Sequence, residues 1–252
     1  AERQHAWNNV WFLDPSIKGA YPNAYIEQEK MLRKMDVRPG DMLLPPAGVE
    51  GSDSTQAIAY YEMAALGGRP AALQKLGDIY RTTAAVKRSL SDPIRAGRIQ
   101  LPARFFEPLP HTYARRLLHR DEARGYNAIV MTWGPGQGTP LHDHGGIWCV
   151  EGVVAGEMAV VQYELVEPAE AEPPASPGAL YRFVQRGRVH ALAGASGALI
   201  PPFEYHTLTN ALPDHVSVTL HVYGGEMKQC HVFEPAGDGT FRRVEKQLVL
   251  ND

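Results

Sequence analysis

Short clusters of apolar residues, separated by glycine-rich turns, run through the chain from about residue 100 onward. They lie within residues 126–133, 147–154, 158–166, 179–185, 215–223 and 229–235, and turns such as "GPGQG", "AGE", "RGR" and "GDG" follow several of them. Many short apolar runs with turns of this kind are typical of antiparallel β-structure. The pattern therefore predicts a mainly β domain, a barrel or sandwich, over residues 100–252.

A helical pattern precedes the β region. Residues 54–66 begin with Ser and Thr and are followed by two glycines, and the next stretch, 70–90, begins with Pro70, a residue favoured in the first turn of a helix. Residues 1–52 are rich in aromatic residues, Pro and Gly, without a clear period. We therefore predict an N-terminal extension (1–52), a helical region packing on the barrel (53–99), and the β domain (100–252). A Pro- and Ala-rich surface loop is expected at 167–178.

Composition narrows the possible partners and location. The 252 residues carry a formal net charge of −3, and no stretch approaches the roughly 18 apolar residues that span a membrane. These features argue against a nucleic-acid or membrane partner. The chain has 2 cysteines, too few for a disulfide framework, and its first residues lack the pattern of a secretory signal. We expect a cytoplasmic protein, a monomer or small homo-oligomer.

Candidate metal ligands begin with His142 and His144, which are separated by one residue. Residues i and i+2 of a strand point to the same face, so both imidazoles could reach one ion, and imidazole suits iron, zinc, copper and nickel. The residues around them resemble the first signature of the cupin superfamily, which runs from Gly136 through both histidines to Gly156. That signature usually carries Glu where this chain has Cys149.

A second cupin signature follows about fifty residues later. Pro201, His206 and Asn210 have its spacing, although Phe203 and Ala195 stand where glycine is usual. Two partial matches in the right order point to a metal site formed by three histidines in a cupin (double-stranded β-helix, or jelly-roll) barrel. Three neutral histidines without a carboxylate leave a dication uncompensated, which favours an anionic ligand from the substrate, such as a thiolate.

Residues 215–223 alternate between apolar and polar side chains. Val216, Val218, Leu220 and Val222 share one face, and His215, Ser217, Thr219, His221 and Tyr223 share the other. This pattern fits a surface strand with a wet outer face, or a strand whose polar face lines the metal pocket. The nearness of His206 in the sequence favours the second interpretation.

These residues resemble the cysteine dioxygenase family of thiol dioxygenases. The similar segments, between about residues 100 and 235, include "YARRLL", "WGPGQGTPLHDH", "HTLTN", "TLHVY" and "CHVFEP". The resemblance implies that Fe(II) is bound by His142, His144 and His206. It implies that Cys149 can form a thioether with Tyr223, that Tyr223, His221 and Cys149 are catalytic, and that the Thr219 hydroxyl contacts the substrate. It further implies that Arg115, beside Tyr113, binds a substrate carboxylate. Cys230 is expected to be a packing residue.

The implied reaction oxidises a small thiol to its sulfinate with dioxygen. Arg115 favours cysteine, because family members that oxidise 3-mercaptopropionate tend to have Gln at that position. An arginine of the family is missing, however, from the segment 206–210, so 3-mercaptopropionate and mercaptosuccinate stay open as substrates. For the second carboxylate of mercaptosuccinate, Arg116 or Arg120 could supply the charge.

Other functions compete with this interpretation. One alternative is a cupin isomerase or a hydrolase that uses zinc or manganese. Neither reaction requires Cys149 or the polar strand face formed by Thr219, His221 and Tyr223. A non-catalytic cupin would bind metal without consuming oxygen. Residues 7–42 weakly resemble a segment of family 1 β-glucosidases, but they lack that family's catalytic carboxylates, without which a glycoside is not hydrolysed.

Overall fold

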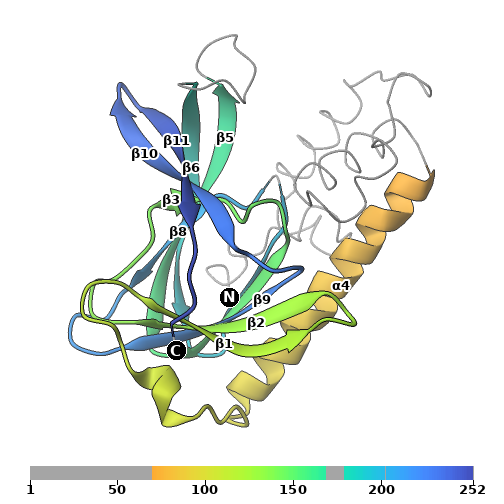
Figure 1. The fold of residues 1–252 in the computed structure, drawn as a ribbon, viewed down its shortest axis with the longest axis vertical. Helices are drawn as coiled ribbons and strands as arrows, with labels where there is room; N and C mark the ends of the chain where they lie inside the picture. Colours follow the sequence, from red (N-terminus) through yellow and green to blue (C-terminus); the bar gives the residue numbers. More distant parts are fainter. Residues whose placement is uncertain (1–69, 169–178, 202, 252) are drawn as a thin grey trace.

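The computed structural model describes residues 70–168, 179–201 and 203–251 (Figure 1). These residues form helix α4 (Pro70–Arg95), the short 3₁₀ helix η3 (Ala103–Phe106) and a series of strands. The strands are β1 (Ala114–Asp121), β2 (Tyr126–Trp133), β3 (Leu141–His142), β4 (Cys149–Ala155), β5 (Glu157–Pro168), β6 (Leu180–Leu192), β7 (Ser196–Leu199), β8 (His206–Asn210), β9 (Ser217–Tyr223), β10 (Gln229–Gly237) and β11 (Thr240–Gln247). The predicted helix at 54–66, the N-terminal extension and most of the loop at 167–178 lie outside the described residues.

The strands form two antiparallel sheets. One is five-stranded, in the order β1-β2-β9-β4-β7, and the other closes on itself in the order β10-β11-β6-β5-β8-β3. Figure 1 shows the long strands β5, β6, β10 and β11 projecting beyond the body of the molecule. This architecture confirms the predicted mainly β, cupin-type fold with a helix on its N-terminal side.

Helix α4 covers the outer face of the five-stranded sheet, along β4 and β7. It starts at Pro70, as predicted, and continues past the predicted end at residue 90 to Arg95. Leu90 and Ile94 are buried against the sheet. A side chain at Gly152 would bring its Cβ within 3.2 Å of Ile94 Cδ1, so glycine on β4 lets the helix pack closely.

Strand β9 is central to the site because both of its faces are buried. Val218, Leu220 and Val222 pack in the apolar layer that contains Leu90 of α4 and Phe105 of η3. The face with Thr219, His221 and Tyr223 turns inward. The structure thus confirms that the polar face is internal and excludes the alternative of a solvent-exposed strand face.

Two residues of the cupin signatures, Gly156 and Asn210, stabilise the barrel and do not line the cavity. Gly156 has a φ of 78° in the turn from β4 to β5, and a Cβ there would lie within 2.9 Å of three Ser217 atoms. Asn210 donates from Nδ2 to the carbonyls of Trp133, Gly134 and His215, and its Oδ1 accepts from Ser217. These contacts fix the ends of β2, β8 and β9, on which the site depends.

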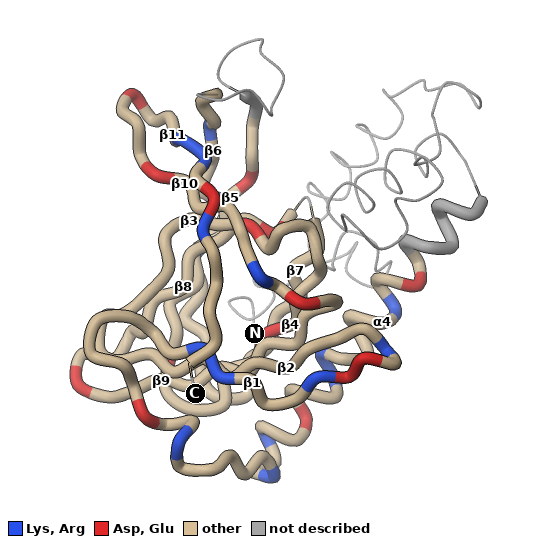
Figure 2. The backbone as a smooth tube through the Cα atoms, viewed as in Figure 1, with Lys and Arg blue, Asp and Glu red and all other residues tan. Residues whose placement is uncertain are grey.

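Most charged residues of the described chain lie on the outside of this framework, and the buried ones are Arg115, Arg116, Asp143, Glu151 and Glu204. Figure 2 shows Lys and Arg interspersed with Asp and Glu along the described chain, without a region of a single sign. Among the described residues, no helix is long and apolar enough to cross a membrane.

Candidate metal and substrate site

The three predicted metal ligands meet between the two sheets. His142 and His206 are cross-strand partners on β3 and β8, whereas His144 lies just beyond the end of β3. The sequence predicted that the two histidines of the His-x-His pair share one strand face. They do not, because β3 ends at His142. The ring nitrogens of all three nevertheless lie within 4.8 Å of one another, and all three side chains are buried.

Each of these imidazoles is oriented by a hydrogen bond at Nδ1. His142 Nδ1 lies 3.0 Å from the Pro140 carbonyl and His206 Nδ1 lies 2.7 Å from the Glu204 carbonyl. His144 Nδ1 lies 3.0 Å from Glu204 Oε2. The lone pair of Nε2 is then available to a metal. The buried Nε2 of His206 has no hydrogen-bond partner among the described residues. Histidines that ligate metals are oriented in the same way.

Burial keeps these histidines neutral. Loss of hydration lowers the pKa of His142 and of His144 to about 4. The adjacent His144 lowers the pKa of His142 further, and the Asp143 carboxylate partly offsets the shift of both histidines. Burial lowers the pKa of His206 well below its ordinary value, and the adjacent histidines lower it further. A neutral imidazole is the form that binds a metal, so the donor set fits a divalent transition metal.

Glu204 was not anticipated from the sequence. Its buried carboxylate accepts hydrogen bonds through Oε2 from the backbone nitrogen of His144, at 2.9 Å, and from Nδ1 of the same residue. Burial raises the pKa of Glu204 well above its ordinary value, and the backbone hydrogen bond from His144 opposes that shift. The position of Glu204 two residues before His206 is a weak signal of this role in the sequence.

Asp143, between the two histidines, supports the same loop from outside the cavity. It accepts hydrogen bonds from the backbone and the Nδ1 of His231, at 2.8 Å each, and from the backbone of Gly145. Burial alone would raise the pKa of Asp143, but these hydrogen bonds outweigh it and lower that pKa. The loop that carries His144 is therefore fixed to β10.

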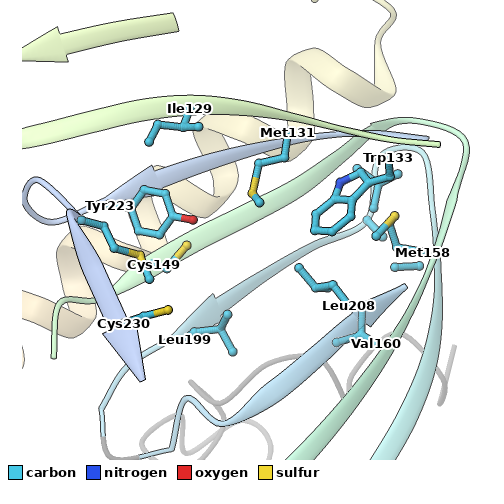
Figure 3. Packing of buried hydrophobic residues seen from close by; sticks show 14 of the residues in the cluster. Ile129, Met131, Trp133, Cys149, Met158, Val160, Leu199, Leu208, Tyr223 and Cys230 are labelled. Carbon is cyan, nitrogen blue, oxygen red and sulfur yellow. The ribbon is translucent and has the colours of Figure 1, made fainter. Parts of the chain in front are cut away.

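Strands β4 and β9 supply the opposite wall. Their register pairs Cys149 directly with Tyr223, and Glu151 with His221. Figure 3 shows the Tyr223 ring next to Cys149, surrounded by apolar side chains. Burial raises the pKa values of the Cys149 thiol and the Tyr223 phenol well above their ordinary values, and a hydrogen bond from Tyr223 partly offsets the shift at Cys149.

A chain of hydrogen bonds fixes His221. Trp133 Nε1 donates to Thr219 Oγ1 at 2.9 Å, so the Thr219 proton is available for His221 Nε2, 2.7 Å away. The imidazole proton of His221 then lies on Nδ1. The cavity lining does not include Thr219. Its predicted contact with substrate is replaced by a contact with His221.

Glu151 is the second carboxylate that the sequence did not reveal. It is 1% exposed, and its Oε2 lies 3.3 Å from His221 Nδ1 and 4.0 Å from His206 Nε2. Glu151 follows Cys149 by two residues on β4 and shares its strand face, so the cavity contains a carboxylate in addition to the three predicted histidine ligands. The period-2 alternation of strand residues was the available signal.

Arg115 is the arginine that faces the cavity, together with Tyr113. Its guanidinium is buried, with Nη1 3.4 Å from the Val249 carbonyl and no partner for Nη2 among the described residues. Arg116 turns away and donates to Thr132, and Arg120 is exposed in an ion pair with Glu226. The suggestion that Arg116 or Arg120 supplies a second charge to the pocket is therefore wrong.

These side chains enclose a single cavity. Its described lining consists of Tyr113, Arg115, Met131, Thr139, His142, His144, Glu151, His206, Leu208, His221, Tyr223, Met227, Cys230 and Leu248. Cys230 packs in the surrounding core, as predicted, but it also lines the cavity, and burial raises its pKa to about 12. Seven of the nine predicted site residues line or adjoin one space with histidines at its centre, and Cys149 and Thr219 lie directly behind it.

Comparison with known families identifies this arrangement. Residues 103–236, more than half of the chain, match the family model for cysteine dioxygenase type I. The chain belongs to this family. Membership of this family supports the interpretation of the protein as a cupin-type thiol dioxygenase. Such an enzyme is an oxidoreductase that uses a metal, a small-molecule substrate and dioxygen.

Several solved structures are similar to this chain. One is TT1209 from Thermus thermophilus, with 17% identity and a TM-score of 0.34, covering 50% of this chain and 94% of that chain. Another is an RmlC-like cupin from Desulfovibrio desulfuricans, with 14% identity and a TM-score of 0.35, covering 51% and 97%. An oxalate oxidase bound to glycolate has 16% identity and a TM-score of 0.32, covering 50% and 59%.

Proposed function

We propose that this member of the cysteine dioxygenase family is an Fe(II)-dependent enzyme that oxidises a small carboxylate-bearing thiol, foremost cysteine, to its sulfinate. The balanced reaction is R–SH + O₂ → R–SO₂⁻ + H⁺. The observation that carries the proposal is the cavity in which three buried, neutral histidines and a buried arginine meet. 3-Mercaptopropionate and mercaptosuccinate are the alternative substrates.

His142, His144 and His206 would hold the iron. Three neutral protein ligands leave coordination positions open, as in other non-haem iron oxygenases. A bound Fe(II) supplies a site where thiolate and dioxygen can react side by side. The unpartnered Nε2 of buried His206 supports this assignment, because a buried nitrogen without a partner is costly unless something binds it.

Arg115 would bind the substrate carboxylate. Its Nη2 lacks a partner among the described residues, and a carboxylate can accept two parallel hydrogen bonds from a guanidinium. Tyr113, whose ring is tilted against that of Trp133 with 4.6 Å between the centroids, would hold the carboxylate end of the substrate from the same side. Among the described residues, no salt bridge has to be broken before this arginine can bind a ligand.

Tyr223 and His221 would act at the reacting sulfur, and Thr219 would position His221 through the 2.7 Å hydrogen bond. Tyr223 and Cys149 are direct cross-strand partners, which supports a thioether between them. Such a bond would fix the phenol over the cavity. We further propose residues 100–252 as the catalytic domain, 53–99 as its supporting helical region, and the cytoplasm as its location.

The test is oxygen consumption by the Fe(II)-loaded protein with cysteine, 3-mercaptopropionate and mercaptosuccinate. We expect uptake of one O₂ for each sulfinate formed. The His206→Ala variant should lose stoichiometric iron binding as well as uptake. A protein that binds iron in the wild-type form but consumes no oxygen with any thiol would instead be a non-catalytic cupin.

A further inference from the structure

Residues 248–251, which follow β11, contact the arginine proposed to bind the substrate carboxylate. Strand β11 ends at Gln247, and the segment then leaves the closed sheet and reaches Arg115 on β1, the edge strand of the five-stranded sheet. Figure 1 shows this part of the chain running from β11 to β1. The match to the family model ends at residue 236 and does not include the segment. Its role therefore follows from its own contacts.

Asn251 binds both backbone polar groups of Arg115. Its Oδ1 accepts a hydrogen bond from the Arg115 backbone nitrogen at 2.8 Å, and its own backbone nitrogen donates to the Arg115 carbonyl at 2.6 Å. On the other side of β1, Arg115 is the cross-strand partner of Met131 on β2. An edge strand carries a row of backbone groups without a neighbouring strand. Asn251 satisfies two of them at the residue whose side chain enters the cavity, and so it holds the backbone of Arg115 in place.

The same segment holds the guanidinium of Arg115. Nη1 donates to the Val249 carbonyl at 3.4 Å, whereas the buried Nη2 has no partner among the described residues. One nitrogen of the guanidinium is therefore held by protein, and the other is directed to a ligand in the cavity that Arg115 lines. Restricting a flexible side chain before a ligand binds reduces the conformational entropy that is lost on binding. The contacts of residues 248–251 thus prepare Arg115 for a carboxylate.

Leu248 completes the cavity wall on this side. Its side chain lines the cavity and packs against the surrounding apolar cluster, and its backbone nitrogen donates to the Lys228 carbonyl at 2.8 Å. Two residues earlier, Lys246 Nζ lies 5.7 Å from the centre of the Tyr113 ring. The segment is therefore attached to the residues before β10 at one end and to β1 at the other, and it contacts the cavity between these two points.

We propose that residues 248–251 form part of the substrate site and that Asn251 is a positioning residue, which holds Arg115 in the orientation that binds the carboxylate of the thiol. Asn251 acts through Arg115 and does not line the cavity itself. This inference rests on the proposed function, because it concerns the substrate of that reaction. Loss of the Asn251 side chain should therefore weaken the binding of thiols that carry a carboxylate and spare thiols that lack one.

The experiment is calorimetric titration of the Co(II)-loaded protein, without oxygen, with cysteine and with cysteamine, which lacks only the carboxylate. In Asn251→Ala we expect the Kd for cysteine to rise about 3- to 10-fold, as for the loss of one neutral hydrogen bond, and the Kd for cysteamine to stay unchanged. Asn251→Asp keeps an acceptor at the same position and should restore most of the affinity for cysteine.

Gln247→Ala is the matched control. Gln247 precedes the segment, and its side chain contacts Gln229 and Glu245 outside the cavity, so this variant should bind both thiols like the wild type. Equal weakening of cysteine and cysteamine in Asn251→Ala, or no change for either, would overturn the proposal. An Asn251→Asp variant that bound cysteine no better than Asn251→Ala would also overturn it.

Turnover separates this inference from the proposed function. With oxygen and the Fe(II)-loaded protein, Asn251→Ala should raise the KM for cysteine by the same factor with little change in kcat. A wild type that binds cysteine more tightly than cysteamine but oxidises neither would refute the proposed function alone, and the titration would still decide the role of Asn251. A wild type without preference for cysteine over cysteamine would overturn this inference.

If Asn251→Ala does not fold, amide hydrogen exchange in the Co(II)-loaded wild type decides. If the contact between Asn251 and Arg115 favours binding of a carboxylate, bound carboxylate must stabilise that contact in return, because coupling between two binding events is reciprocal. Saturating cysteine should therefore slow exchange of the Arg115 amide, and saturating cysteamine should not. Equal protection by the two thiols would contradict the positioning role.

Discussion

Replacing Glu204 with alanine should weaken both the fold and the metal site. The substitution leaves two buried donors of His144 unsatisfied, its backbone N–H and its Nδ1–H, which now lie 2.9 and 3.0 Å from Glu204 Oε2. Each unsatisfied buried donor costs about 1–3 kcal/mol, so the free energy of unfolding of the metal-free protein should fall by roughly 2–6 kcal/mol. Metal affinity should fall about 10- to 100-fold, as for other groups that orient a ligating histidine.

The assays are urea unfolding of the metal-free protein and competition for Co(II) against a chromophoric chelator. Glu204→Gln keeps an oxygen acceptor and should lose less than half as much stability as the alanine variant. Glu157→Ala is the matched control, because Glu157 contacts His190 in a pair that is far more exposed; it should change stability by less than about 1 kcal/mol. If Glu204→Ala bound Co(II) as tightly as the wild type, the orienting role would be refuted.

Three further predictions concern the cavity. Cys149→Ala should collapse any doublet on a denaturing gel to one band, and a surviving doublet would rule out the thioether as its cause. Arg115→Gln should raise the KM for cysteine about 10- to 100-fold, whereas Arg120→Gln, in an exposed ion pair, should not; equal effects would remove Arg115 from the site. His142 and His144 have pKa values lowered from 6.5 to about 4. Acidification from pH 6.5 to 4 therefore protonates the unfolded chain before the folded one. Each histidine's contribution to the unfolding free energy of the metal-free protein should fall across this window, by roughly 3 kcal/mol at its lower end. The raised pKa of Glu204 has the opposite pH dependence, so the urea titrations use the Glu204→Gln variant, and a flat profile in that variant would contradict the neutral site.

Local patterns in the sequence were sufficient to identify the strands around the site. The alternation in 215–223 placed Thr219, His221 and Tyr223 on one face, and β9 has that arrangement because neighbouring residues of a strand point in opposite directions. The start of α4 at Pro70 was also predictable, since proline suits the first turn of a helix. The end of α4 was not, because its last turn is held by burial of Ile94 against β4 rather than by a local signal.

The sequence by itself determined the chemical groups of the site: three histidines, a cysteine, a tyrosine and an arginine at recognisable spacings. Only the tertiary structure decided which neighbours join them. It excluded Arg116 and Arg120 from the cavity, and it brought Glu151 and Glu204 to the histidines. These contacts join strands that are distant in the chain, and the direction of a buried side chain depends on the pairing and closure of both sheets. Spacing along the chain carries no information about that closure.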